Sequence, residues 1–147
     1  MRHFWFGVAV AVAALVAIVL TVPHPSRASV SIHLDPGGNV ADYLRWYRRL
    51  ADAGVIAKVD GSCVSACTLV LAMPSAAVCI TREARLGFHL ASLNGVDDPA
   101  VTEQLVQEFY PPSLQQWIKE HGPLVSAPIY MSGAEAIALG VMKECKL

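Results

Sequence analysis

The sequence predicts a single α/β domain that follows a hydrophobic N-terminal segment. With 147 residues, the chain has the length of one domain. Segments with the alternating pattern of strands and segments with the periodicity of helices follow one another from residue 30 onward. Such an alternation is typical of helices packed on a sheet that is at least partly parallel.

The first 28 residues have the pattern of a targeting segment. Arg2 is followed by an uncharged apolar run over residues 4–20, and Ser26-Arg27-Ala28 places small residues at the −3 and −1 positions of a cleavage site. We therefore expect residues 1–28 to be a signal peptide or a membrane anchor, and residues 29–147 to be the folded domain. This organisation predicts a periplasmic or other extracytoplasmic protein, held at the inner membrane through residues 4–20 if the segment is retained.

The charge of the chain does not favour nucleic acid as a partner. The formal net charge is −1. Without residues 1–28, which contain Arg2 and Arg27, 9 basic and 12 acidic side chains remain, and the net charge becomes −3. No basic run remains to form a phosphate-binding stripe. The sequence predicts no cofactor.

The domain opens with a predicted strand–helix–strand unit. Residues 30–34 alternate like a strand, and Pro36-Gly37-Gly38 forces a turn. Apolar side chains then recur at helical spacing over residues 39–53, with Gly54 where a C-terminal cap belongs. Residues 55–59 form the second strand, and we expect it to run parallel to the first. The opposite helix face, which we expect to be solvated, carries Arg45, Arg48 and Arg49.

The middle of the chain alternates between short apolar segments. We expect a loop over residues 60–62, followed by an apolar helix from Ser65 to about Met73, because Pro74 ends that run. Residues 77–80 and 86–89 have the composition of strands.

The C-terminal third is predicted to be mainly helical. Asp98-Pro99 is a capping residue followed by proline at the first helical position, and that helix should extend to about Tyr110. After a break at two prolines, another helix is expected over residues 113–121. A capping box opens at Ser132 and predicts a short helix that ends at Gly140, with Val141 and Met142 as a final edge strand.

Four cysteines lie in the part that we expect to be exported: Cys63, Cys67, Cys79 and Cys145. An even number in an oxidising compartment predicts one or two disulfides, and the sequence leaves all three complete pairings open. The spacing of the first two is neither the C-x-x-C of thiol oxidoreductases nor a haem attachment motif. Zinc would require better-placed ligands, so no metal site is predicted.

Three motifs together suggest a nucleophilic site. Ser65 stands at the start of an apolar helix that follows a strand, where the helix N-terminus favours developing negative charge. The N–H groups of Ala66 and of Gly37 or Gly38 could form an oxyanion hole beside it. His89 ends a later strand and could act as the general base. Each motif alone is common in proteins without a catalytic role.

The combination resembles the proteolytic subunit of the Clp protease and the wider ClpP/crotonase superfamily. The matching elements run in register from about Ile32 to Met142: Pro36-Gly37-Gly38, Gly61 with Ser65, Arg85 with His89, Tyr130-Met131-Ser132 with the helix after it, and Gly140-Val141-Met142. The cysteines on either side of Ser65 resemble those of exported members. The resemblance implies the repeated β-β-α spiral fold of the superfamily. Because the family's opening strand and helix are missing, we expect this fold to be shortened at its N-terminus and to expose a sheet edge.

The resemblance also implies an activity. Ser65 would be the nucleophile and His89 the base of an ATP-independent serine hydrolase, most plausibly a peptidase, that acts on a peptide or protein and forms a homo-oligomer. One departure bears on this reading, since the family's third catalytic residue, an aspartate, corresponds here to Pro128. Asp97, Asp98 or Glu135 could replace it. The alternatives are a catalytically inactive binding or assembly module with the same fold and, less well supported, acyl-CoA chemistry.

Overall fold

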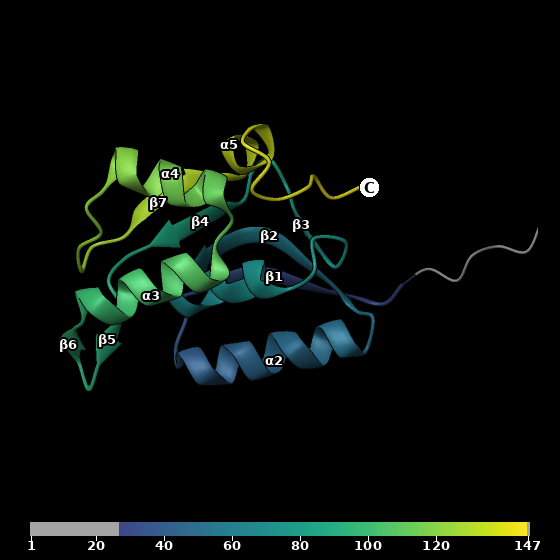
Figure 1. Ribbon diagram of the computed structural model, residues 1–147. Coiled ribbons are helices and arrows are strands. Elements are labelled where there is room, and N and C mark those ends of the chain that lie inside the picture. Colours follow the sequence, from purple (N-terminus) through teal and green to yellow (C-terminus); the bar gives the residue numbers. More distant parts are fainter. Residues whose placement is uncertain (1–26, 147) are drawn as a thin grey trace, which may run out of the picture.

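The computed structural model describes residues 27–146, which form a mixed α/β domain (Figure 1). A five-stranded sheet has the order β1-β2-β4-β7, with β3 also paired to β2, and β5 and β6 form a separate hairpin. The elements are β1 (Ser29–Asp35), α2 (Val40–Asp52), β2 (Ile56–Val64), the 3₁₀ helix η1 (Ser65–Ala72), β3 (Val78–Ile80), β4 (Arg85–Phe88), β5 (Ser92–Leu93), β6 (Val96–Asp97), α3 (Pro99–Phe109), α4 (Pro112–His121), β7 (Ile129–Ser132) and α5 (Gly133–Ala138).

The predicted strand–helix–strand unit is confirmed. β1 and β2 are parallel neighbours, joined by α2. The Asn39 side chain caps the helix by accepting a hydrogen bond from the Asp42 N–H at 3.1 Å. At the other end, Gly54 follows the C-cap with a φ of +67°, as its place in the sequence predicts.

The segment expected to be a loop at residues 60–62 is instead part of β2, and that prediction is wrong. The register of β1 against β2 shifts between Ile32 and Leu34, around His33. A Cβ built on Gly61 would lie 1.9 Å from the His33 carbonyl oxygen, so only glycine allows the two backbones to come this close. Gly61 therefore allows β1 and β2 to pair with an irregular register, and it does not form a turn.

β2 also provides the pairing edge for the next two strands. β3 pairs with residues 57–59 of β2 and β4 with residues 62–64, both in parallel. β7 then returns antiparallel to β4. The edge strand predicted at Val141 and Met142 does not form, and both side chains are buried. The chain beyond them forms an isolated β-bridge between Ile80 and Glu144.

The helices of the second half begin where the sequence predicts. Asp98 caps α3 by accepting from the Val101 N–H at 3.0 Å, and Ser132 caps α5 by accepting from the Glu135 N–H at 3.2 Å. The reciprocal half of the expected capping box is absent, because the Glu135 carboxylate accepts from Trp117 Nε1 at 2.8 Å. Figure 1 shows α2 near β1 and α4 near β7, at opposite ends of the view.

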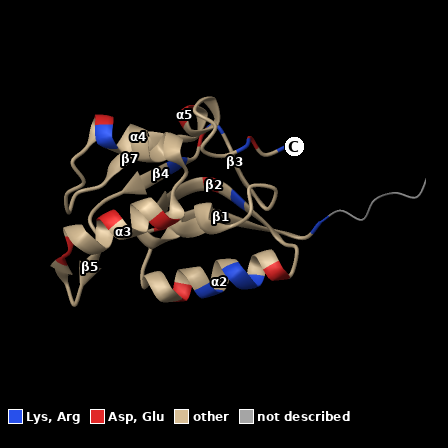
Figure 2. Ribbon diagram, in the orientation of Figure 1, with Lys and Arg blue, Asp and Glu red and all other residues tan. Residues whose placement is uncertain are grey.

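One apolar core holds these elements together. Its largest fully buried side chains come from α2, η1, the sheet and α4: Tyr47, Phe88, Leu69, Ile80, Leu86, Leu114 and Met131. The arginine face of α2 is solvent-exposed as predicted, and Figure 2 shows basic and acidic segments interspersed along that helix. Within residues 27–146, nothing pairs with the outer side of β1, and Leu34 on that strand is 82% exposed.

The hydrophobic run at residues 4–20 lies outside the described residues. Of the helices within residues 27–146, none is long and apolar enough to cross a membrane. Whether residues 1–28 act as signal peptide or anchor therefore remains a prediction from sequence.

All four cysteines form disulfides. Cys63 pairs with Cys67, and Cys79 pairs with Cys145. The first bridge spans 4 positions of the chain and the second spans 66, so the second ties the C-terminal segment to β3. Thiols in these bridges are not free to ligate a metal ion.

The two bridges should differ in their effect on stability. Loop-closure entropy in the unfolded chain grows with loop length, so the bridge that spans 66 positions should contribute about 4 kcal/mol and the bridge that spans 4 about 2 kcal/mol. We expect Cys79→Ala/Cys145→Ala to lower the free energy of unfolding more than Cys63→Ala/Cys67→Ala does, as measured by denaturant unfolding without reductant. The reverse order would contradict the chain-entropy explanation.

Candidate active site

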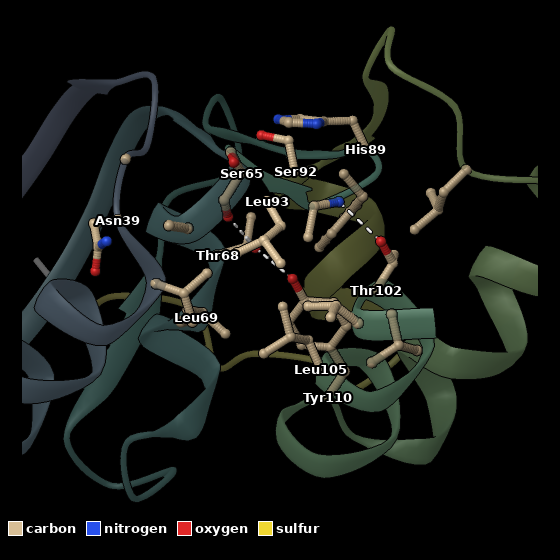
Figure 3. A pocket seen from close by; sticks show the side chains of 18 of the residues that line it. Asn39, Ser65, Thr68, Leu69, His89, Ser92, Leu93, Thr102, Leu105 and Tyr110 are labelled. Carbon is tan, nitrogen blue, oxygen red and sulfur yellow. Dashed lines mark hydrogen bonds between the residues drawn. The ribbon is translucent and has the colours of Figure 1, made fainter. Parts of the chain in front are cut away.

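Ser65 occupies the junction between β2 and η1, at the mouth of a pocket of about 380 Å³ (Figure 3). The backbone φ of Ser65 is 58°, in the left-handed region that residues other than glycine seldom adopt. This conformation turns the chain sharply from the strand into the helix. Residues in such strained conformations cluster at functional sites, because the surrounding structure must hold them there.

The turn after β1 lies directly against Ser65. Gly37 has a φ of +86°, and a Cβ built on it would lie 2.6 Å from the Ser65 Cβ and 2.8 Å from the Ala66 nitrogen. The Gly37 N–H donates to Asp35 Oδ1 at 2.9 Å, and the Tyr43 hydroxyl donates to the same oxygen at 2.5 Å. Burial, together with this bond to the carboxylate, raises the pKa of Tyr43 to about 12. The hydroxyl therefore remains a donor at neutral pH, and Asp35 holds the turn in place.

These contacts separate the two glycines of the predicted oxyanion hole. The Gly37 N–H is bound to Asp35, whereas Gly38 lines the pocket together with Ser65 and Ala66. Within residues 27–146, no protein acceptor takes the N–H of Gly38 or of Ala66. Gly38 and Ala66 therefore remain the two candidates for oxyanion-hole donors among the predicted residues.

A buried hydrogen-bond chain holds the backbone on the other side of Ser65. Thr68 Oγ1 donates to the Ser65 carbonyl at 2.6 Å and lies 2.5 Å from the Tyr110 hydroxyl. Since the threonine hydrogen is used on the carbonyl, the phenol is the donor to Thr68. Burial raises the pKa of Tyr110 to about 12, so the phenol keeps its proton at neutral pH. This chain fixes the first turn of η1.

His89 follows β4 directly and lines the same pocket. Its Nδ1 lies 2.6 Å from the Leu90 carbonyl oxygen. A carbonyl can only accept, so Nδ1 carries the hydrogen and, in the neutral ring, Nε2 is the acceptor. Figure 3 shows the ring on the side of the pocket where Ser65 and Ser92 lie. Among the described residues, no hydrogen bond joins the Ser65 hydroxyl to this ring.

No carboxylate supports His89 in the described residues. Phe88 and Ile129 form the last pair of the antiparallel strands, so His89, directly after Phe88, and Pro128, directly before Ile129, lie at the same end of the β4–β7 pair. Pro128 is the position at which the resemblance implies an aspartate. The three acids that could replace it are engaged elsewhere: Asp97 with Ser126, Asp98 with the α3 N-terminus, and Glu135 with Trp117.

The pocket is mostly apolar. Among the described residues that line it, there is no aspartate, glutamate, lysine or arginine. Large apolar walls come from η1, β4, α3 and the segment before β7, and they include Leu69, Phe88, Leu105, Val106 and Leu124. Leu93 of the β5–β6 hairpin reaches the rim and is 61% exposed.

Comparison with solved structures identifies the fold. A crystal structure of the ClpP protease catalytic domain from Plasmodium falciparum superposes with a TM-score of 0.50 and 16% sequence identity, covering 83% of this chain and 73% of that one. A structure described only as that of an enzyme gives a TM-score of 0.50 at 6% identity, covering 92% of this chain and 85% of the other. The domain thus has a ClpP-like fold. No family model and no curated protein matches the sequence.

The structure brings together every predicted site residue, and it adds groups that the sequence did not reveal. Ser65, His89, Gly38 and Ala66 line one pocket, with Gly37 packed behind Ser65. The Thr68–Tyr110 pair and the Leu90 carbonyl were missed, as the proline pair after Tyr110 indicated only a helix break. The one available signal was Thr68, a polar residue in the otherwise apolar helix after Ser65.

Gly37→Ala should lower the free energy of unfolding more than Gly54→Ala, a glycine-to-alanine change at a similar φ. The new methyl group would collide with Ser65, in addition to the cost of about 1 kcal/mol for alanine at positive φ. Gly54→Ala is the matched control, because Gly54 has a φ of +67° and nothing within 4 Å of the built Cβ. We expect Gly37→Ala to lose about 1–3 kcal/mol more than the control in denaturant unfolding. Equal losses of unfolding free energy in the two variants would show that the new methyl group at position 37 does not collide with Ser65.

Proposed function

We propose that this protein is a serine hydrolase, most plausibly a peptidase, that works without ATP. The observation that supports it best is the strained Ser65 turn, which opens onto a pocket also lined by His89, Gly38 and Ala66. The fold of a protease domain is consistent with this proposal but does not by itself establish activity.

The proposed reaction has two stages. Ser65 Oγ attacks the carbonyl carbon of the substrate while His89 Nε2 takes the hydroxyl proton, and the carbonyl oxygen becomes an oxyanion between the Gly38 and Ala66 N–H groups. The histidine returns the proton to the leaving group, which leaves an acyl ester on Ser65. Water, activated by the same histidine, hydrolyses this ester. In unliganded enzymes the bond between nucleophile and base is often long and tightens when substrate binds.

The Leu90 carbonyl takes part of the role of the missing aspartate. By accepting from Nδ1–H at 2.6 Å, it fixes the tautomer in which Nε2 is the base. A neutral carbonyl dipole stabilises an imidazolium less than a carboxylate does, because it carries no net charge. We therefore expect a functional but slower site than one with a complete triad.

The pocket favours an uncharged, apolar acyl group. Its walls offer no charged side chain to pair with a charged substrate residue. A volume of about 380 Å³ accommodates a bulky aliphatic or aromatic side chain next to the scissile bond.

Location and assembly belong to the same proposal. The leader-like residues 1–28 and the two disulfides are consistent with a periplasmic or other extracytoplasmic compartment, with residues 4–20 as anchor if they are retained. A homo-oligomer is favoured by the unpaired outer side of β1 within the described residues and by Leu34, which is 82% exposed on that strand.

The alternative is a binding or assembly module that keeps the fold without catalysis. Two observations on the described residues favour it, namely Pro128 at the position where the resemblance implies an aspartate and the missing hydrogen bond between Ser65 and His89. Nucleophile labelling separates the two functions, because a module has no need for an activated serine.

The activated serine should react with a fluorophosphonate probe. We expect covalent labelling of the purified full-length protein, abolished in Ser65→Ala and reduced at least 100-fold in His89→Ala, because the base contributes about 10²–10⁴-fold. Absence of labelling in a protein that is folded by circular dichroism would reject the hydrolase in favour of the module.

A carboxylate at position 128 should accelerate the site. Pro128→Asp introduces an acid at the end of the β4–β7 pair from which His89 extends, and we expect it to stabilise the imidazolium and to make labelling at least tenfold faster. Pro128→Asn is the matched control, with similar size and no charge. Equal labelling rates in the two variants would show that the absence of the acid does not limit the reaction.

A further inference from the structure

The Cys63–Cys67 disulfide closes a small ring around the nucleophile. Cys63 lies in β2, where it pairs with both Asp35 and Leu86, and Cys67 lies in η1. Their Cα atoms are 5.3 Å apart, whereas four residues of extended strand would span about 13 Å. The chain between them therefore reverses, and Ser65 stands at the centre of the reversal.

Both ends of this ring are fixed to the core. The two cysteines are fully buried, and the Tyr47 hydroxyl of α2 donates to the Cys67 carbonyl at 2.8 Å. Cys63 is held by the strands on both sides of β2. Consequently the disulfide joins two anchored points, and the residues that remain to adjust between them are Val64, Ser65 and Ala66.

We propose that this disulfide is a positioning element of the catalytic site: it holds Ser65 in the left-handed conformation that points its hydroxyl and the Ala66 N–H into the pocket. The proposal rests on the proposed hydrolase function. Without the bridge, Ser65 can relax toward an ordinary conformation, because a left-handed residue costs about 1–2 kcal/mol. Both reacting groups then leave the positions that catalysis requires.

This role is distinct from stabilising the fold. A merely structural disulfide would change labelling only by changing the fraction of folded protein. Because it closes the longer loop, the Cys79–Cys145 bridge should contribute more to stability. It joins β3 to the C-terminal segment, and neither of its cysteines lines the pocket. The two disulfides therefore provide matched variants with opposite expected effects.

The experiment compares fluorophosphonate labelling rates of the full-length protein, Cys63→Ala/Cys67→Ala and Cys79→Ala/Cys145→Ala. Labelling is measured well below the melting temperature of all three and across pH. We expect the first variant to label at least tenfold more slowly while the midpoint of its pH profile stays unchanged, because the bridge acts on the nucleophile and not on the base. The second variant should show the larger fall in melting temperature but label at the parental rate.

The outcomes separate the two proposals. If the parent protein labels at Ser65 and Cys63→Ala/Cys67→Ala labels equally fast, the positioning role is rejected and the hydrolase function stands. If both double variants slow labelling in proportion to their loss of melting temperature, the bridge is only structural. If the parent protein does not label, the hydrolase function itself fails.

Discussion

The left-handed turn at Ser65 is the constraint on which the rest of the site depends. The nine-residue strand β2 ends directly before Ser65, and the 3₁₀ helix η1 begins at Ser65, whose φ is 58°. Three sets of contacts hold that conformation. Gly37 presses on the Ser65 Cβ, the Thr68–Tyr110 chain holds the Ser65 carbonyl, and the disulfide encloses the turn. A strained conformation held by three sets of contacts is the basis of the functional hypothesis for Ser65.

His89 is oriented by the backbone rather than by an acidic side chain. Among the described residues, no carboxylate forms a hydrogen bond or ion pair with this ring, and the three candidate acids cap a helix or bind other side chains. The peptide group that carries the Leu90 carbonyl is fixed, because its N–H, which is that of Ala91, donates to Thr102 Oγ1 at 2.9 Å. The ring is therefore oriented by a backbone carbonyl rather than by a carboxylate.

Sequence patterns predicted the elements better than they predicted their junctions. Helix caps at Asn39, Asp98 and Ser132 were visible because capping is a local interaction between a side chain and the next turn. The segment at Gly61 was taken for a loop because glycine usually signals a turn. Its actual role is to admit the His33 backbone, and that contact joins residues far apart in the chain. The prediction of a final edge strand was wrong for a similar reason. Val141 and Met142 pack into the core and do not pair with a sheet edge.

By itself, the sequence determined the α/β class and the strand–helix–strand opening, because periodicity and capping are local. It indicated Ser65, His89 and the neighbouring backbone as a candidate site only through the order of three motifs together with the resemblance to the ClpP/crotonase superfamily. Only the tertiary structure decided the disulfide pairing, the division of labour between Gly37 and Gly38, the tautomer of His89 and the support of Ser65 by Thr68 and Tyr110. Each of these depends on the distance between groups from different elements, and residue order does not specify that distance until the core has packed.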